Sequence, residues 1–164
     1  MRRVHFRGEA KSIFKKLQQC WNHANITRHR KFKLFRSIIV PTLMYNLESI
    51  WINQDSLNRI NSFHVRCLRQ ICRIDPSFIS RMPNSEIYAL CGEPLLSMVL
   101  HKRQTKLYQS ITELSENDVM RKLTCAPNSV YPKVWDHNRK RGRPKQQWAP
   151  CVFKLAIQMG TIVV

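Results

Sequence analysis

Apolar residues recur at helical spacing along most of this chain, and only four glycines interrupt the pattern. Alternating apolar and polar residues of the kind that predict β-hairpins are not visible. In the first 26 residues, helical spacing places apolar residues along one side and lysines on the other, which predicts a basic amphipathic helix. The apolar side consists of Ile13, Phe14, Leu17, Cys20, Trp21 and Ala24. The sequence therefore predicts an all-α fold, a small helical bundle that is long enough, at 164 residues, to bury a core.

The next two predicted helices lie between residues 27 and 73. Thr27 is a suitable N-cap for the first of them. Pro41 should kink or break this helix near Val40, because proline lacks an amide donor and clashes with the preceding turn. Asp55 is the expected N-cap of the second helix. The predicted buried side of that helix is Leu57, Ile60, Phe63, His64, Cys67, Leu68 and Ile71.

A loop with two prolines follows, and Asn84 or Ser85 should then begin a short helix that ends at Gly92. Pro94 fits the first position of a longer helix, and Asn117 is a candidate cap for a last short turn. The chain is thus divided into an amphipathic helix (1–26), a helical region (27–123), a basic linker (124–145) and a C-terminal helix (146–164).

The charge balance points to a polyanionic partner. Lys and Arg number 28 against 10 Asp and Glu, a formal net charge of +18. Such an excess stabilises contacts with phosphates through counterion release, so we expect RNA or DNA as the partner. No apolar run approaches the roughly 20 residues of a bilayer span and no secretory signal is visible, so an intracellular location, nuclear or cytoplasmic, is expected without a membrane partner.

Two groups of basic residues are the candidate nucleic-acid contacts. One group lies on the helix after Asp55, where it either tracks a phosphate backbone or solvates a face. It consists of Arg59, Arg66, Arg69 and Arg73. The second group lies in the basic linker and consists of Arg139, Lys140, Arg141, Arg143 and Lys145. Its Gly-Arg-Pro turn suggests an alternative function, a stand-alone chromatin-associated protein that enters A/T-rich minor grooves like an AT-hook.

The residues give no indication of catalysis. The acidic residues are dispersed, and no Asp-Asp pair, phosphate-binding loop, nucleophile elbow or His-Glu-x-x-His motif is present. We therefore expect no enzyme activity from the chain as it stands, no cofactor and no small-molecule substrate. His64 and Cys67 could supply two metal ligands, but a buried structural histidine is the favoured interpretation. Tyr45 and Trp51 could stack on bases, although a role in the core is favoured.

One long stretch carries a family resemblance. "RKFKLFRSIIVPTLMYNLESIWINQDSLNRINSFHVRCLRQICRI" resembles the region that follows the polymerase palm in non-LTR (LINE-like) retrotransposon reverse transcriptases. The matching positions are Pro41, Leu43, Tyr45, Glu48, Trp51, Phe63, His64, Cys67, Leu68, Arg69 and Ile71. The likeness covers roughly residues 28–156, and "RKRGRPKQQWAPCV" resembles a basic run near the end of many such proteins.

Two positions depart from the family pattern, since Asn46 replaces a glycine and Gln109-Ser110 replaces a Gly-His pair. Only about 30 residues precede the match, and none supplies the family's Phe/Tyr-Ala-Asp-Asp metal site. The resemblance therefore implies a truncated reverse transcriptase, a thumb-like helical segment with a C-terminal tail and without the catalytic centre. It implies binding to the backbone of RNA or DNA without sequence preference.

Overall fold

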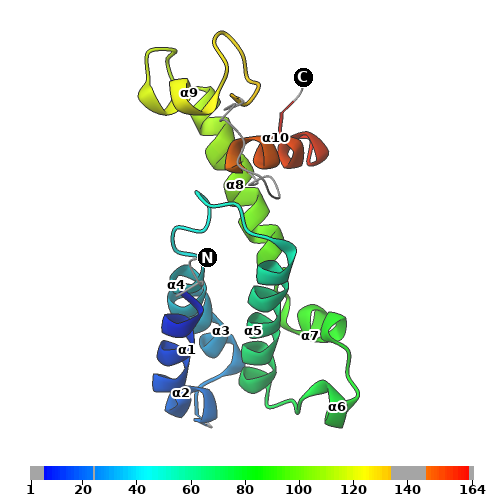
Figure 1. Ribbon diagram of the computed structural model, residues 1–164. Helices are drawn as coiled ribbons and strands as arrows, with labels where there is room; N and C mark the ends of the chain where they lie inside the picture. Colours follow the sequence, from blue (N-terminus) through cyan, green and yellow to red (C-terminus); the bar gives the residue numbers. More distant parts are fainter. Residues whose placement is uncertain (1–5, 24, 134–146, 163–164) are drawn as a thin grey trace, which may run out of the picture. The chain divides into compact units, whose positions relative to one another are not determined.

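The computed structural model describes residues 6–23, 25–133 and 147–162 (Figure 1). Within these ranges all regular structure is helical apart from an isolated bridge between Cys125 and Pro132, so the predicted all-α class is confirmed. In chain order the elements are α1 (Phe6–Lys16), α2 (Gln18–Asn22), α3 (Arg28–Leu34), the π-helix η1 (Phe35–Ile39), α4 (Val40–Met44), α5 (Gln54–Cys72), α6 (Ser77–Ser80), α7 (Asn84–Cys91), α8 (Leu96–Thr112), α9 (Val119–Thr124) and α10 (Trp148–Gln158).

The elements form two compact units. The first unit comprises the described residues up to Tyr45 together with Asn53–Val99. The second combines Asn46–Ile52 with the described residues from Leu100 onward. The first unit includes α1, which packs against α4 and η1 and buries Ala10 and Phe14. Sequence order could not show that residues 46–52 belong with the C-terminal helix.

The core of the first unit is built on α5, which packs against α3 and α7. Every apolar position predicted for this helix is buried, His64 included, which confirms the periodicity. The short α2 adds Trp21, which is fully buried. Its indole Nε1 donates to the carbonyl of Phe14 at 2.8 Å, and the two rings stack with centroids 5.0 Å apart.

The helix continues through Pro41, so of the two predicted outcomes near Val40, a kink or a break, the break is wrong. The chain instead passes from α3 into the π turn η1 and directly into α4, where Pro41 occupies the first turn. The amide of Val40 donates to the carbonyl of Phe35, five residues back. A wider turn before the proline accommodates a residue that has no amide hydrogen, since the i−4 bond is already out of register there.

Helix boundaries agree with the sequence at some caps and differ at others. Thr27 caps α3 as predicted, its hydroxyl accepting from the amide of Arg30 at 3.4 Å. The cap of α5 is Asn53 rather than Asp55, and its amide oxygen accepts from the Ser56 amide at 3.0 Å. Asp118, not Asn117, caps α9, and α8 begins two residues after Pro94. Asn, Asp and Thr cap helices about equally well, so residue type alone does not identify the cap where several of them lie close together in the sequence.

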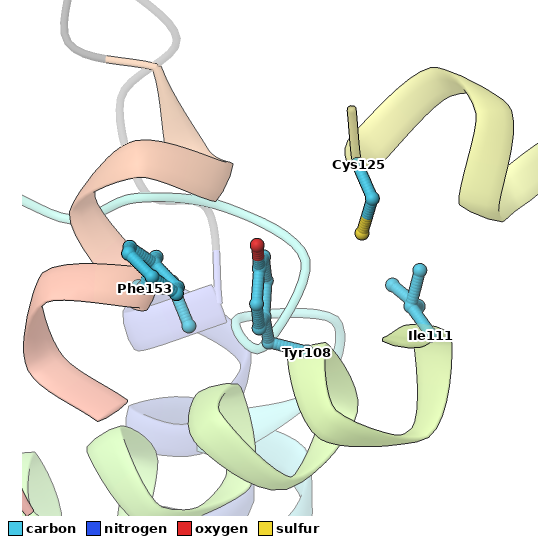
Figure 2. Close-up of a cluster of buried hydrophobic side chains, with 5 residues drawn as sticks. Tyr108, Ile111, Cys125 and Phe153 are labelled. Atoms are coloured by element: carbon cyan, nitrogen blue, oxygen red, sulfur yellow. The ribbon is translucent and has the colours of Figure 1, made fainter. Parts of the chain in front are cut away.

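Tyr108 and Phe153 lie at the centre of the second unit (Figure 2). The buried cluster is Tyr108, Ile111, Cys125, Val152 and Phe153, with Trp51 and Trp148 among the partly buried residues against it. The hydroxyl of Tyr108 donates to the Val130 carbonyl at 2.8 Å. The predicted C-terminal helix is confirmed, and its Trp148 indole donates to the carbonyl of Glu48 at 2.8 Å.

Candidate nucleic-acid interface

The exposed side of α5 carries Arg59 and Arg66, and Arg73 follows directly after the last residue of the helix, so three arginines recur at intervals of seven residues. Arg59, Arg66 and Arg73 are all exposed. Seven residues are close to two helical turns, so the side chains of Arg59 and Arg66 start from one face, about 10 Å apart along the axis. We call these three residues the α5 arginine row. Arg59 and Arg66 thus place two exposed positive charges along one helix face, a spacing that suits contacts with a phosphate backbone.

The prediction that Arg69 lies on the exposed face of α5 with Arg59 and Arg66 is wrong. Arg69 is 6 % exposed, and its guanidinium holds the loop between α5 and α7. One terminal nitrogen donates to the Asp75 carbonyl at 2.9 Å and the other to the Met82 carbonyl at 2.6 Å. Ser80 and Asn84 accept two further bonds. Periodicity misplaced this residue because it counts arginine as polar, whereas a planar guanidinium can satisfy its donors on buried carbonyls.

Arg73 combines exposure with a structural contact. It follows the last residue of α5 in a left-handed conformation, with φ 58° and ψ 41°. Its guanidinium donates to the carbonyl of Asn22 at 2.7 Å, at the end of α2. A cation at this position complements the free carbonyls of a helix C-terminus. Arg59 and Arg66 are therefore the two members of the row to test by substitution.

A hollow of about 630 Å³ borders the row at Arg66. Its lining includes polar side chains of Ser62, Gln70 and Asn84 and the ring of Phe78. Phe78 lies on α6 and is 81 % exposed, an unusual position for a phenylalanine. An aromatic face beside an arginine suits stacking of an unpaired base. Sequence reasoning missed Phe78 because it expected a loop here, and α6 has only four residues, too few to show a helical period.

A second basic surface lies on α3 and η1, which the sequence-based site did not include. His29, Lys33, Arg36 and Ser37 line a hollow of about 440 Å³. Arg36 is also committed to Glu93, with 2.6 Å between Nε and Oε1. The run "RHRKFK" was a signal for this surface, but not all of it is exposed. Lys31 is 5 % exposed and donates through Nζ to the Trp21 carbonyl at 2.7 Å.

The other candidate residues lie outside the described ranges, at an exposed position or against a core. Arg139, Lys140, Arg141, Arg143 and Lys145 lie outside the described residues. Tyr45 is 71 % exposed, so the favoured core role does not hold for it. Trp51 packs against the second unit's core, as that interpretation expected. Asn46, where the family has glycine, adopts a φ of 56°, a conformation that asparagine tolerates better than most residues.

His64 and Cys67 are buried, as the structural interpretation of His64 expects. Burial lowers the pKa of His64 to about 4 and raises the pKa of Cys67 to about 12, so both are neutral at pH 7. His64 stacks on Phe35 at 5.6 Å between ring centroids, and neither of its ring nitrogens has a hydrogen-bond partner. Across the described ranges, no three side chains of His, Cys, Asp or Glu come together as a metal site.

No protein-family model, curated protein or solved structure matches this chain. Among the described helices, none combines the length and the apolar character needed to cross a bilayer.

Proposed function

We propose that this chain is a thumb-like segment of a non-LTR retrotransposon reverse transcriptase and binds the backbone of RNA or DNA without sequence preference. The observation that carries the binding proposal is the α5 arginine row. The order of motifs over residues 28–156 supports the family assignment. The sequence has no adjacent aspartates, so the proposal includes no polymerase activity for this chain.

The net charge of the chain and the spacing of the exposed arginines both support binding to a nucleic-acid backbone. The formal charge of +18 attracts any polyanion, and a line of exposed arginines converts that attraction into contacts with successive phosphates. Each such contact releases condensed counterions, so affinity should fall steeply as salt is added. The hollow at Arg66 and Phe78 offers in addition a place for an unpaired base.

Fluorescence anisotropy with labelled RNA, duplex DNA and RNA/DNA hybrid, measured over a range of salt concentrations, tests the proposal. The wild-type chain should bind several unrelated sequences with similar affinity. The double variant Arg59→Ala/Arg66→Ala should bind roughly tenfold more weakly at low salt, with a slope of log affinity against log salt that is smaller by about two. Both residues are exposed, so the fold should be kept.

A charge-matched control distinguishes the row from general attraction. Lys122→Ala/Lys154→Ala also removes two exposed charges, but these lie on different helices of the second unit. If both double variants lose affinity equally, the row is not a binding surface. A preference for A/T-rich duplex that is abolished by Arg143→Ala would instead support the AT-hook alternative.

A further inference from the structure

Two cysteines of the first unit lie in contact. The Sγ atoms of Cys72 and Cys91 are 3.5 Å apart. Cys72 is the last residue of α5, and Cys91 is the last residue of α7. Both side chains are 8 % exposed. The pair thus joins two helices that pack against each other but are separated in the chain by the loop that Arg69 holds.

The position of the pair favours a covalent bond. A disulfide needs the two sulfurs at about 2.0 Å, so they must approach by about 1.5 Å, a movement that side-chain rotation and a small shift of backbone can supply. Each cysteine is followed by a residue in left-handed conformation, Arg73 and Gly92, where the chain leaves its helix. Neither helix therefore has to bend at its centre for the sulfurs to meet.

We infer that Cys72 and Cys91 are a redox-active dithiol, a modification site that a low-molecular-weight disulfide such as oxidised glutathione converts to an intramolecular disulfide. One protein thiolate attacks a sulfur of the small disulfide and expels the first small thiolate, which leaves a mixed disulfide. The second protein thiolate then attacks the protein sulfur of that intermediate and expels the second. Two protein thiols are oxidised, one small disulfide is reduced to two thiols, and the two protons pass to the leaving thiolates.

The surroundings of the pair make this reaction slow while the helices stay packed. Burial first, and then the contact with Cys72 and the carboxylate of Glu93, raise the pKa of Cys91 to about 12, while Arg28 acts in the opposite direction. The attacking thiolate is therefore scarce at neutral pH. Local opening at the end of α7 admits the oxidant and hydrates the thiol. The pair accordingly responds to sustained oxidation rather than to brief exposure.

Oxidation would fix the segment between the two cysteines. The bond closes a loop that contains α6, all of α7 before Cys91 and the carbonyls held by Arg69. Closing such a loop limits the unfolded chain more than the folded one. The inference goes beyond nucleic-acid binding and does not depend on it.

Peptide mapping of the purified full chain tests the inference. The protein is equilibrated in buffers of reduced and oxidised glutathione, free thiols are alkylated, and the products are digested with trypsin without reduction. We expect one dominant species in oxidising buffer, peptide 70–73 linked to peptide 82–102, with both thiols lost together. Dithiothreitol should restore both thiols. Fully alkylated Cys72 and Cys91 in oxidising buffer, or glutathione on single cysteines only, would overturn the inference.

A denatured sample provides the control for the fold. In guanidinium chloride the preferred link should shift to Cys67–Cys72, because short loops close most readily in an unfolded chain. The same link between Cys72 and Cys91 in native and denatured protein would mean that the fold does not direct it, and would also overturn the inference.

Thermal unfolding of the first unit provides an independent readout. Oxidation should raise its midpoint by roughly 5 to 10 °C. Cys72→Ser and Cys91→Ser should each abolish the increase. Cys20→Ser, a matched change at a partly exposed cysteine of the same unit, should keep it. An equal increase in all three variants would show that another bond is responsible.

Discussion

Irregular backbone is held by different kinds of side chain at two places in the molecule, by Arg69 in the first compact unit and by Tyr108 and Trp148 in the second. In the first unit, Arg69 on α5 donates to carbonyls of the loop between α5 and α7, and Asn61 on the same helix accepts from the Ser97 amide at the start of α8. In the second unit, aromatic residues bury their rings and donate from their polar edge to irregular backbone, as Tyr108 and Trp148 do. Arg69 contributes hydrogen bonds and no apolar core surface. Tyr108 and Trp148 contribute a ring to the core and a hydrogen bond at its edge.

This difference determines how each unit should respond to substitution. In the first unit, loss of the Arg69 side chain should release the loop between α5 and α7 and leave its carbonyls without their hydrogen-bond donor. Losing a ring in the second should open a cavity at the centre of the unit. Hydrogen exchange with mass spectrometry separates the two responses, because peptides from each unit report their own protection.

Arg69→Ala should have the largest effect. It removes a buried guanidinium that makes four hydrogen bonds, and we expect a loss of about 3 to 5 kcal/mol of unfolding free energy in the first unit. Hydrogen exchange should accelerate most over residues 73–90. Arg66→Ala, on the exposed side of the same helix, is the matched control and should change stability little. Similar losses in both variants would contradict the role given to Arg69.

Much of the first unit could be predicted from the sequence, and less of the second. The buried side of α5 follows from spacing alone, since a helix of 19 residues repeats its face over five turns. The contact of Trp148 with the Glu48 carbonyl joins residues 100 apart in sequence, which no local pattern encodes. In the candidate site, periodicity identified Arg59 and Arg66 as exposed but not the buried Arg69. The hollow at Phe78 depends on how the segment between α5 and α7 folds against α5, which no local pattern predicts.

Phe153→Ala should have the next largest effect, and in the second unit only. Its ring lies among Tyr108 and Tyr131, with centroids 5.9 and 5.4 Å away, and the side chain is 7 % exposed. Removing it should cost about 3 to 4 kcal/mol through lost burial and the cavity that remains. Protection of α10 and of the end of α8 should fall. Phe78→Ala, at an exposed position, is the control. Equal loss of protection in the first unit would show that the units do not respond separately.

The buried His64 should make the first unit sensitive to acid. Its pKa is about 4 in the folded chain against 6.5 in a model compound, so the unfolded chain binds more protons between these values. Stability is therefore full above pH 6.5 and declines as the pH falls towards 4. The expected loss between pH 7 and pH 5 is about 2 kcal/mol. Urea denaturation followed by exchange of α5 peptides measures it.

His64→Leu should remove this pH dependence. It also replaces two unpaired ring nitrogens with apolar atoms, so the variant should be at least as stable as wild type at pH 7. His101 in the second unit also has a lowered pKa, caused by burial, which is why the readout must come from α5. A wild-type slope that persists in the variant would assign the acid sensitivity to other groups.

Tyr108→Phe should have the smallest effect and measures the polar edge of the second unit separately from its ring. The substitution keeps the buried aromatic surface and removes the bond from the hydroxyl to the Val130 carbonyl. Val130 is partly exposed, so water can replace the lost donor and the expected cost is about 1 kcal/mol. Tyr131→Phe, whose ring packs on Phe153 but is half exposed, should cost less. If Tyr108→Phe destabilised the unit as much as Phe153→Ala, the hydroxyl would hold the 125–133 loop as firmly as Arg69 holds its own loop. The contrast between the two units would then disappear.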